Sequence, residues 1–173
     1  MKRILTIAII LISNVFFAQN LFEKFDNQDN ITGISVNKKM FELMSKVKID
    51  TNDKETQQYL ALINDLDNLK VYVTTNAKAA SEMKSTSEKF LKTSNLDELM
   101  RVTENGRNIK IFVKTGSTET KIKELFMFIE GSGKENQSVI MSLTGDFSLN
   151  QLSSLTNKMN LPGGDILKRA SKN

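Results

Sequence analysis

The second half of the chain alternates apolar and polar positions with the two-residue period of β-strands. Four such stretches follow one another, at residues 99–104, 108–114, 122–130 and 138–144. Asn105-Gly106 separates the first two stretches, and this dipeptide favours a tight hairpin because both residues tolerate positive φ. We therefore predict a four-strand antiparallel meander in this half of the chain.

The first half combines two further strand-like stretches, residues 31–36 and 69–73, with segments of helical periodicity. A short leading helix is predicted at residues 21–25, and a helix capped by Asn37 follows the first strand. Asn76 or Thr75 begins a long helix that continues to about Thr93. Apolar residues at helical spacing define the buried sides of two helices before the second strand: Met40, Phe41, Met44 and Val47 in one, and Tyr59, Leu60, Ile63 and Leu66 in the other.

A last helix is predicted after the meander, where Ser148 and Gln151 have the spacing of a capping box. The complete order of elements predicts an α+β fold, with an antiparallel meander sheet of about six strands packed with four to five helices. No linker divides residues 19–162, which are therefore expected to form a single domain. Pro162-Gly163-Gly164 ends the helix, and residues 163–173 are expected to be a flexible tail.

Residues 1–18 have the features of a secretory signal peptide. Lys2 and Arg3 precede an almost continuous apolar stretch at residues 4–17, and Ala18 offers a small residue for cleavage. As a helix this stretch would span about 21 Å, which is shorter than a hydrocarbon core of about 30 Å. We therefore expect a periplasmic or secreted protein that begins at Gln19 and has no transmembrane anchor after cleavage.

The composition excludes several classes of function. The chain has no cysteine and no histidine, which rules out disulfides, thiol nucleophiles, Ser-His-Asp triads and the usual zinc sites. Without Lys2 and Arg3, the 24 Lys and Arg residues become 22, against 20 Asp and Glu residues. This slight excess does not support nucleic-acid binding, which needs basic residues clustered on one face.

Motifs of enzymes and metal sites are present only in fragments. Ser35-x-x-Lys38 and Lys114-Thr115-Gly116 occur in penicilloyl-serine enzymes, but the Ser-Asp-Asn motif that should lie between them is missing. The acidic runs at residues 26–30 and 50–53 lack the glycine and the bidentate glutamate of a calcium-binding EF-hand. We therefore predict no catalytic residue, no cofactor and no metal site.

Two of the predicted strands, 122–130 and 138–144, are apolar on both faces. In one alternating set, Phe126, Phe128 and Ile140 lie in phase with Phe112 of the neighbouring strand. A sheet with one face in water should have polar residues at these positions. Either helices cover both faces, or these four residues form an apolar interaction face for an unknown protein or apolar ligand.

Several segments resemble the family of domains of unknown function DUF4252. They are Phe22-Glu23-Lys24-Phe25, Lys39-Met40-Phe41-Glu42-Leu43-Met44, Leu66-Asp67-Asn68-Leu69-Lys70-Val71, Glu98-Leu99-Met100 and Ser142-Leu143-Thr144-Gly145. The resemblance implies a small exported protein of Gram-negative bacteria with an uncharacterised envelope or binding role. Some relatives are encoded beside regulators of envelope sigma factors. The lipidated cysteine of the anchored members is missing here, and the family supplies no active-site residues.

These observations favour an exported, non-enzymatic binding or interaction domain of the cell envelope. Two alternatives stay open at this point. One is a carboxylate-dependent hydrolase of envelope polymers, which would need two acidic side chains about 5 to 10 Å apart across a cleft. The other is a structural protein that associates with copies of itself.

Overall fold

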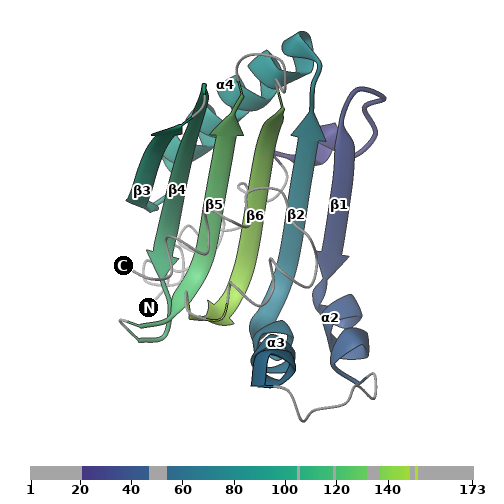
Figure 1. The fold of residues 1–173 in the computed structure, drawn as a ribbon, viewed down its shortest axis with the longest axis vertical. Coiled ribbons are helices and arrows are strands. Elements are labelled where there is room, and N and C mark those ends of the chain that lie inside the picture. The colour runs from purple at the N-terminus through teal and green to yellow at the C-terminus, as the bar shows by residue number, and fades with distance from the viewer. Residues whose placement is uncertain are drawn as a thin grey trace, which may run out of the picture.

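Six strands form one antiparallel sheet in the order β1-β2-β6-β5-β4-β3 (Figure 1). The computed structural model describes residues 21–46, 54–104, 106–118, 120–131, 137–148 and 151. The strands are β1 (Thr32–Asn37), β2 (Leu66–Thr74), β3 (Asp97–Glu104), β4 (Arg107–Thr115), β5 (Ile122–Glu130) and β6 (Ser138–Phe147). The predicted meander is confirmed, because β3, β4, β5 and β6 pair with one another in sequence. Its last strand, β6, also pairs with β2 and thereby joins the two halves of the chain.

Three α-helices and one turn of 3-10 helix accompany the sheet in the described residues. They are η1 (Glu23–Phe25), α2 (Lys38–Ser45), α3 (Lys54–Asp65) and α4 (Ala77–Thr93). Both predicted asparagine caps are confirmed. Asn37 Oδ1 accepts a hydrogen bond from the backbone N–H of Met40 at 3.0 Å, and Asn76 Oδ1 accepts bonds from two N–H groups of the first turn of α4.

The expected count of four to five helices is not met in the described part of the chain. The leading segment is a single 3-10 turn, closed by a bond from Phe25 N to Phe22 O at 3.0 Å, because a segment this short gains too few bonds to sustain an α-helix. The predicted last helix lies outside the described residues except for Gln151, whose side chain accepts a bond from the Ser148 backbone N–H. Residues 1–18 and 163–173, with their predicted roles, also lie outside.

Two details of the predicted helix faces are wrong. Met40 is 50% exposed, whereas Phe41 is 1% exposed, so the buried side of α2 is centred on Phe41 and leaves Met40 facing solvent. Leu66 is buried but is the first residue of β2, not part of the preceding helix. In the described residues, no helix is both long enough and apolar enough to cross a bilayer.

The sheet carries a buried apolar cluster on each face. The first cluster contains Leu69, Val71, Ile109, Leu125, Met127, Met141 and Leu143, with Phe41 of α2 and Leu62 and Ile63 of α3. The second contains Tyr72, Phe126, Phe128 and Ile140, with Ala79, Met83 and Phe90 of α4, Phe25 of η1 and Phe22 directly before η1. In Figure 1, α4 crosses behind the sheet, and α2 and α3 lie at its lower end.

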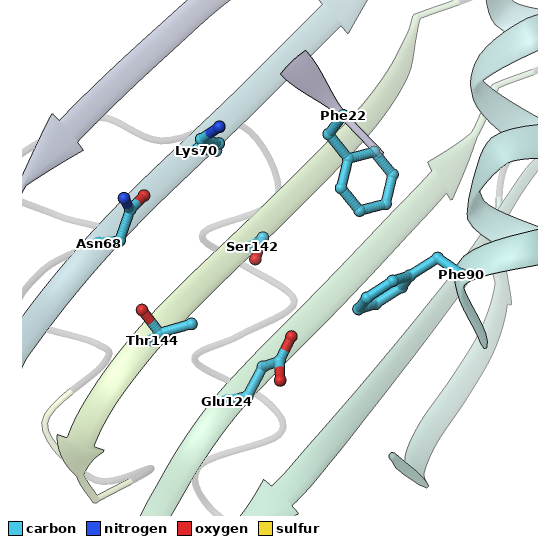
Figure 2. Close-up of a pocket in the computed structure, with 7 residues that line it drawn as sticks. All are labelled: Phe22, Asn68, Lys70, Phe90, Glu124, Ser142 and Thr144. Atoms are coloured by element: carbon cyan, nitrogen blue, oxygen red, sulfur yellow. The ribbon is translucent and has the colours of Figure 1, made fainter. Parts of the chain in front are cut away.

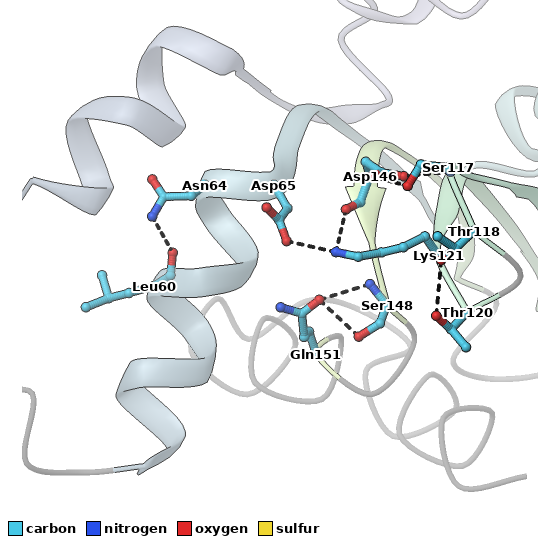
Figure 3. A network of polar contacts seen from close by, with 10 residues as sticks. All are labelled: Leu60, Asn64, Asp65, Ser117, Thr118, Thr120, Lys121, Asp146, Ser148 and Gln151. Carbon is cyan, nitrogen blue, oxygen red and sulfur yellow. Dashed lines mark hydrogen bonds and ion pairs between the residues drawn. The ribbon is translucent and has the colours of Figure 1, made fainter.

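A polar network fastens that lower end (Figure 3). The carboxylate of Asp146 accepts bonds from the backbone N–H and the hydroxyl of Ser117, at 3.0 and 2.7 Å. These bonds lower the pKa of Asp146, with the side-chain bond as the larger cause. Lys121 Nζ donates to the carbonyl oxygen of Asp146 at 2.9 Å and forms an ion pair with Asp65 Oδ2 at 3.3 Å. The network thus ties the β4–β5 turn to the end of β6 and the end of α3.

Candidate functional site

One face of the sheet changes from apolar to polar along its strands. Where α4 and η1 cover it, Tyr72, Ile140, Phe126 and Phe128 form the buried cluster. Closer to the lower end, the same face carries a line of polar residues that are direct cross-strand partners: Asn68 with Thr144, Thr144 with Glu124, and Glu124 with Lys114. Directly opposed residues point to the same face. We name Asn68, Thr144, Glu124 and Lys114 the polar row.

A recess lies over this part of the sheet, with a polar floor and an aromatic wall (Figure 2). Its empty volume is about 360 Å³, including open solvent at the mouth. Three neighbouring strands supply the floor, and two phenylalanines form the wall, one directly before η1 and one in α4. The lining residues are Asn68 and Lys70 of β2, Ser142 and Thr144 of β6, Glu124 of β5, Phe22 and Phe90.

Packing between rings holds the wall in place. Phe22 meets Phe90 edge to face at 5.2 Å between centroids and stacks on Phe126 at 5.6 Å. Phe90 also contacts Phe126 at 4.9 Å. Aromatic pairs in these geometries contribute beyond their buried area. The three rings therefore fix the wall of the recess to the buried cluster beneath α4.

Glu124 is the acidic residue of the recess. Its side chain is half-buried, and loss of solvation raises its pKa, while the positive charge of Lys114 acts in the opposite direction. No hydrogen bond or ion pair to its carboxylate is found among the described residues. Lys70, in contrast, has a side chain that is 14% exposed and forms an ion pair with Glu23 at 3.7 Å. In the part of the chain that the structure describes, the floor therefore contains one cation in an ion pair and one carboxylate without a hydrogen bond or ion pair.

The three neutral polar residues of the floor are also available for a ligand. Asn68, Ser142 and Thr144 are half-buried, and their side chains make no hydrogen bond with other described residues. No buried side-chain oxygen or nitrogen lacks a partner in the described residues, so these groups are open to water. The recess therefore presents several hydrogen-bonding groups together, whose bonds to water a small polar group could replace.

The structure places the four residues of the predicted apolar face side by side, beneath helix cover. Phe126 is 0% exposed, Ile140 0% and Phe128 6%, and Phe112 is partly buried against the same cluster. Of the two explanations for strands apolar on both faces, the described residues show packed elements over this face. A partner could reach the three buried side chains only if α4 or η1 moved.

The fragments of enzyme motifs are not assembled into a site. Ser35 lies on edge strand β1 and Lys114 on β4, with β2, β6 and β5 between them, and Lys38 forms an ion pair with Asp67 at 2.8 Å. In the acidic run at residues 26–30, Asp26 accepts a hydrogen bond from the hydroxyl of Tyr72. No cluster of three or more candidate metal-ligating side chains exists among the described residues.

A model of the family described as domain of unknown function (DUF4252) matches residues 24–155. The chain belongs to the DUF4252 family. The matched range includes every lining residue of the recess except Phe22. Neither the curated proteins nor the solved structures contain a match to this DUF4252 chain.

Proposed function

We propose that this DUF4252 protein is an exported, non-enzymatic binding domain of the bacterial cell envelope, and that the recess above the polar row holds its ligand. The observation that carries the proposal is the floor of the recess, where one carboxylate and three neutral polar side chains lie together without a hydrogen-bond partner among the described residues. The fixed aromatic wall supports it, because sites that combine apolar walls with a few convergent polar groups are typical of ligand binding.

The residues that line the recess favour binding over hydrolysis. Acid-base hydrolysis of glycosidic bonds generally uses two carboxyl groups that flank the bond, and Glu124 is the single acidic residue among the described residues that line the recess. Glu23, which is not among these lining residues, forms an ion pair with Lys70. The described lining therefore offers hydrogen-bonding groups to a polar ligand and does not contain two carboxyl groups.

A binding experiment on the mature chain, residues 19–173, tests this proposal. Amide NMR signals of the wild type are followed while a library of small polar compounds is added. We expect shifts at Asn68, Glu124, Ser142 and Thr144. In Ser142→Leu, which fills the floor, the shifts should disappear. Ser35→Leu is the matched control, because Ser35 is a cross-strand partner of Lys70 outside the recess, and it should bind as the wild type does.

Two results would overturn the proposal. One is that none of the compounds shifts the floor residues, or that the shifts persist in Ser142→Leu. The other is release of soluble fragments from purified peptidoglycan by the mature protein, with loss of this release in Glu124→Gln. The second result would support the hydrolase.

Export is tested separately from binding. The full chain is produced in a Gram-negative bacterium, the compartments are separated, and the mass of the protein is measured. We expect a periplasmic or secreted species that begins at Gln19, as the apolar stretch and Ala18 indicate. A species that keeps residues 1–18 and stays in the membrane fraction would contradict this part of the proposal.

A further inference from the structure

We propose that the recess recognises a cationic group, an ammonium or a guanidinium, with Glu124 as its main acceptor. This inference rests on the proposed binding function and specifies the chemical class of the ligand. It comes from the balance of charges around the floor, the kind of hydrogen-bonding groups there, and the aromatic wall.

Among the described residues around the recess, one acidic group has no ion pair. Lys70 is paired with Glu23. Lys114 is the cross-strand partner of Glu124 and its charge acts on that carboxyl, but it is exposed, lies outside the lining residues, and forms no ion pair with Glu124 within 4.0 Å. The half-buried Glu124 side chain has lost part of its solvation, which raises its pKa, and a cationic ligand would favour its charged form.

The neutral groups of the floor suit a donor-rich ligand. The hydroxyls of Ser142 and Thr144 and the amide oxygen of Asn68 all accept hydrogen bonds, and they lie on the same face as Glu124. An ammonium offers three donors and a guanidinium five. Such a group can satisfy the carboxylate and several neutral acceptors together, whereas an anionic ligand would face the charge of Glu124.

The wall adds an apolar border. Phe22 and Phe90 lie beside the floor (Figure 2), and these residues are 3% and 2% exposed, so the wall would pack against the carbon chain that carries the cationic group. The cation could belong to a free small amine or to a lysine or arginine side chain of a peptide, and the experiment distinguishes these two sources.

The test compares small probes that differ in charge. The mature protein is titrated at constant ionic strength and pH 7.5 with butylammonium, methylguanidinium, butan-1-ol and sodium butyrate, and the amide signals of the floor residues are followed. We expect saturable shifts with the two cations. Glu124→Gln should weaken cation binding about tenfold or more, because a hydrogen bond to a charged group contributes more than a neutral one. Glu88→Gln, an exposed glutamate on α4, is the control and should bind normally.

The source of the cation is determined with an acetylated, amidated Gly-Lys-Gly peptide. Binding tighter than that of butylammonium would assign the site to a peptide side chain, and equal binding would assign it to a free amine. If butanol or butyrate binds as well as the cations, and Glu124→Gln changes nothing, the inference of a cationic ligand is overturned while the binding function remains. If neither these probes nor any library compound shifts the amide signals of the floor residues, the inference of a cationic ligand and the proposed binding function both fail.

Discussion

Tyr72 joins the N-terminal turn to the centre of the sheet. Its hydroxyl donates to Asp26 Oδ1 at 2.6 Å, and its ring packs edge to face on Phe25 at 5.6 Å. We expect Tyr72→Phe to lower the free energy of unfolding by about 1 to 3 kcal/mol, since the lost bond has a charged acceptor. Tyr59→Phe is the control, because no hydrogen bond to the Tyr59 hydroxyl is found in the described residues. The free energy of unfolding should fall less in this variant. Urea unfolding at pH 7 measures both, and equal losses would contradict the assigned role.

The same residue predicts an alkaline loss of stability. Burial, and then the bond to Asp26, raise the pKa of Tyr72 above its ordinary value of 10.0. The unfolded chain therefore ionises this hydroxyl first as the pH rises. The stabilisation is complete below pH 10 and is lost above it. Unfolding measured from pH 9 to 11 should show a shallower decline in Tyr72→Phe than in the wild type.

The ionised carboxylate of Glu124 should lower the free energy of unfolding at neutral pH. Its raised pKa means that the folded chain takes up a proton more readily than the unfolded chain. The stability of the wild type should therefore increase as the pH falls from 7 towards the ordinary value of 4.5, and Glu124→Gln should be more stable at pH 7 with a difference that shrinks on acidification. Urea midpoints at pH 7, 6 and 5 measure this effect. A destabilised Glu124→Gln at pH 7 would mean that the carboxylate has a structural partner.

At the scale of elements, the junction between β2 and β6 depends on Gly145. A β-carbon at this position would collide with the backbone of Asp65 and Leu66, where α3 passes directly into β2 and the register shifts. We expect Gly145→Ala to destabilise the protein by about 1 to 3 kcal/mol through overpacking. The control is Gly33→Ala on β1, where the new atom would lie 3.5 Å from Tyr72 Cε1, an ordinary contact. Thermal unfolding of both variants tests this difference.

The elements themselves could be predicted because their signals are local. Alternation at residues 122–130 gives the bounds of β5, and the side chains of Asn37 and Asn76 determine where α2 and α4 begin. The position of β6 beside β2 could not be predicted in the same way, since it depends on contacts between residues far apart in sequence. The exposure of Met40 could not be predicted either, because apolar spacing alone does not show which residues of an apolar stripe reach the core.

The recess could not be predicted from the alternation within single strands, for a related reason. The polar row exists only after four strands are aligned, and no single strand shows it. A signal was nevertheless present. Glu124, Ser142 and Thr144 interrupt the alternating set that also contains Phe126 and Ile140, so one end of that face had to be polar. The aromatic residues of the same set form the buried cluster, which adjoins the recess without forming its floor.

At the scale of the whole molecule, stability should decrease from the centre of the sheet to its edges. Strands β2, β6, β5 and β4 each pair on both sides, whereas β1 and β3 are the edge strands. The large apolar residues Ile34 of β1 and Leu99 of β3 are each 41% exposed. Amide hydrogen exchange should be slowest in the four interior strands and fastest in the two edge strands. Equal protection of β1 or β3 would indicate that a copy of the chain covers that edge, and solution size measured against concentration would show it.

The central position of β6 affects how the protein can be made. This strand pairs with β2 on one side and with β5 on the other, yet it follows both in the order of synthesis. Without residues 138–147, the other strands can form only two separate half-sheets, β1–β2 and β3–β4–β5, each with an unpaired edge where β6 would lie. A chain truncated before residue 138 should therefore aggregate through these edges instead of forming a smaller stable protein.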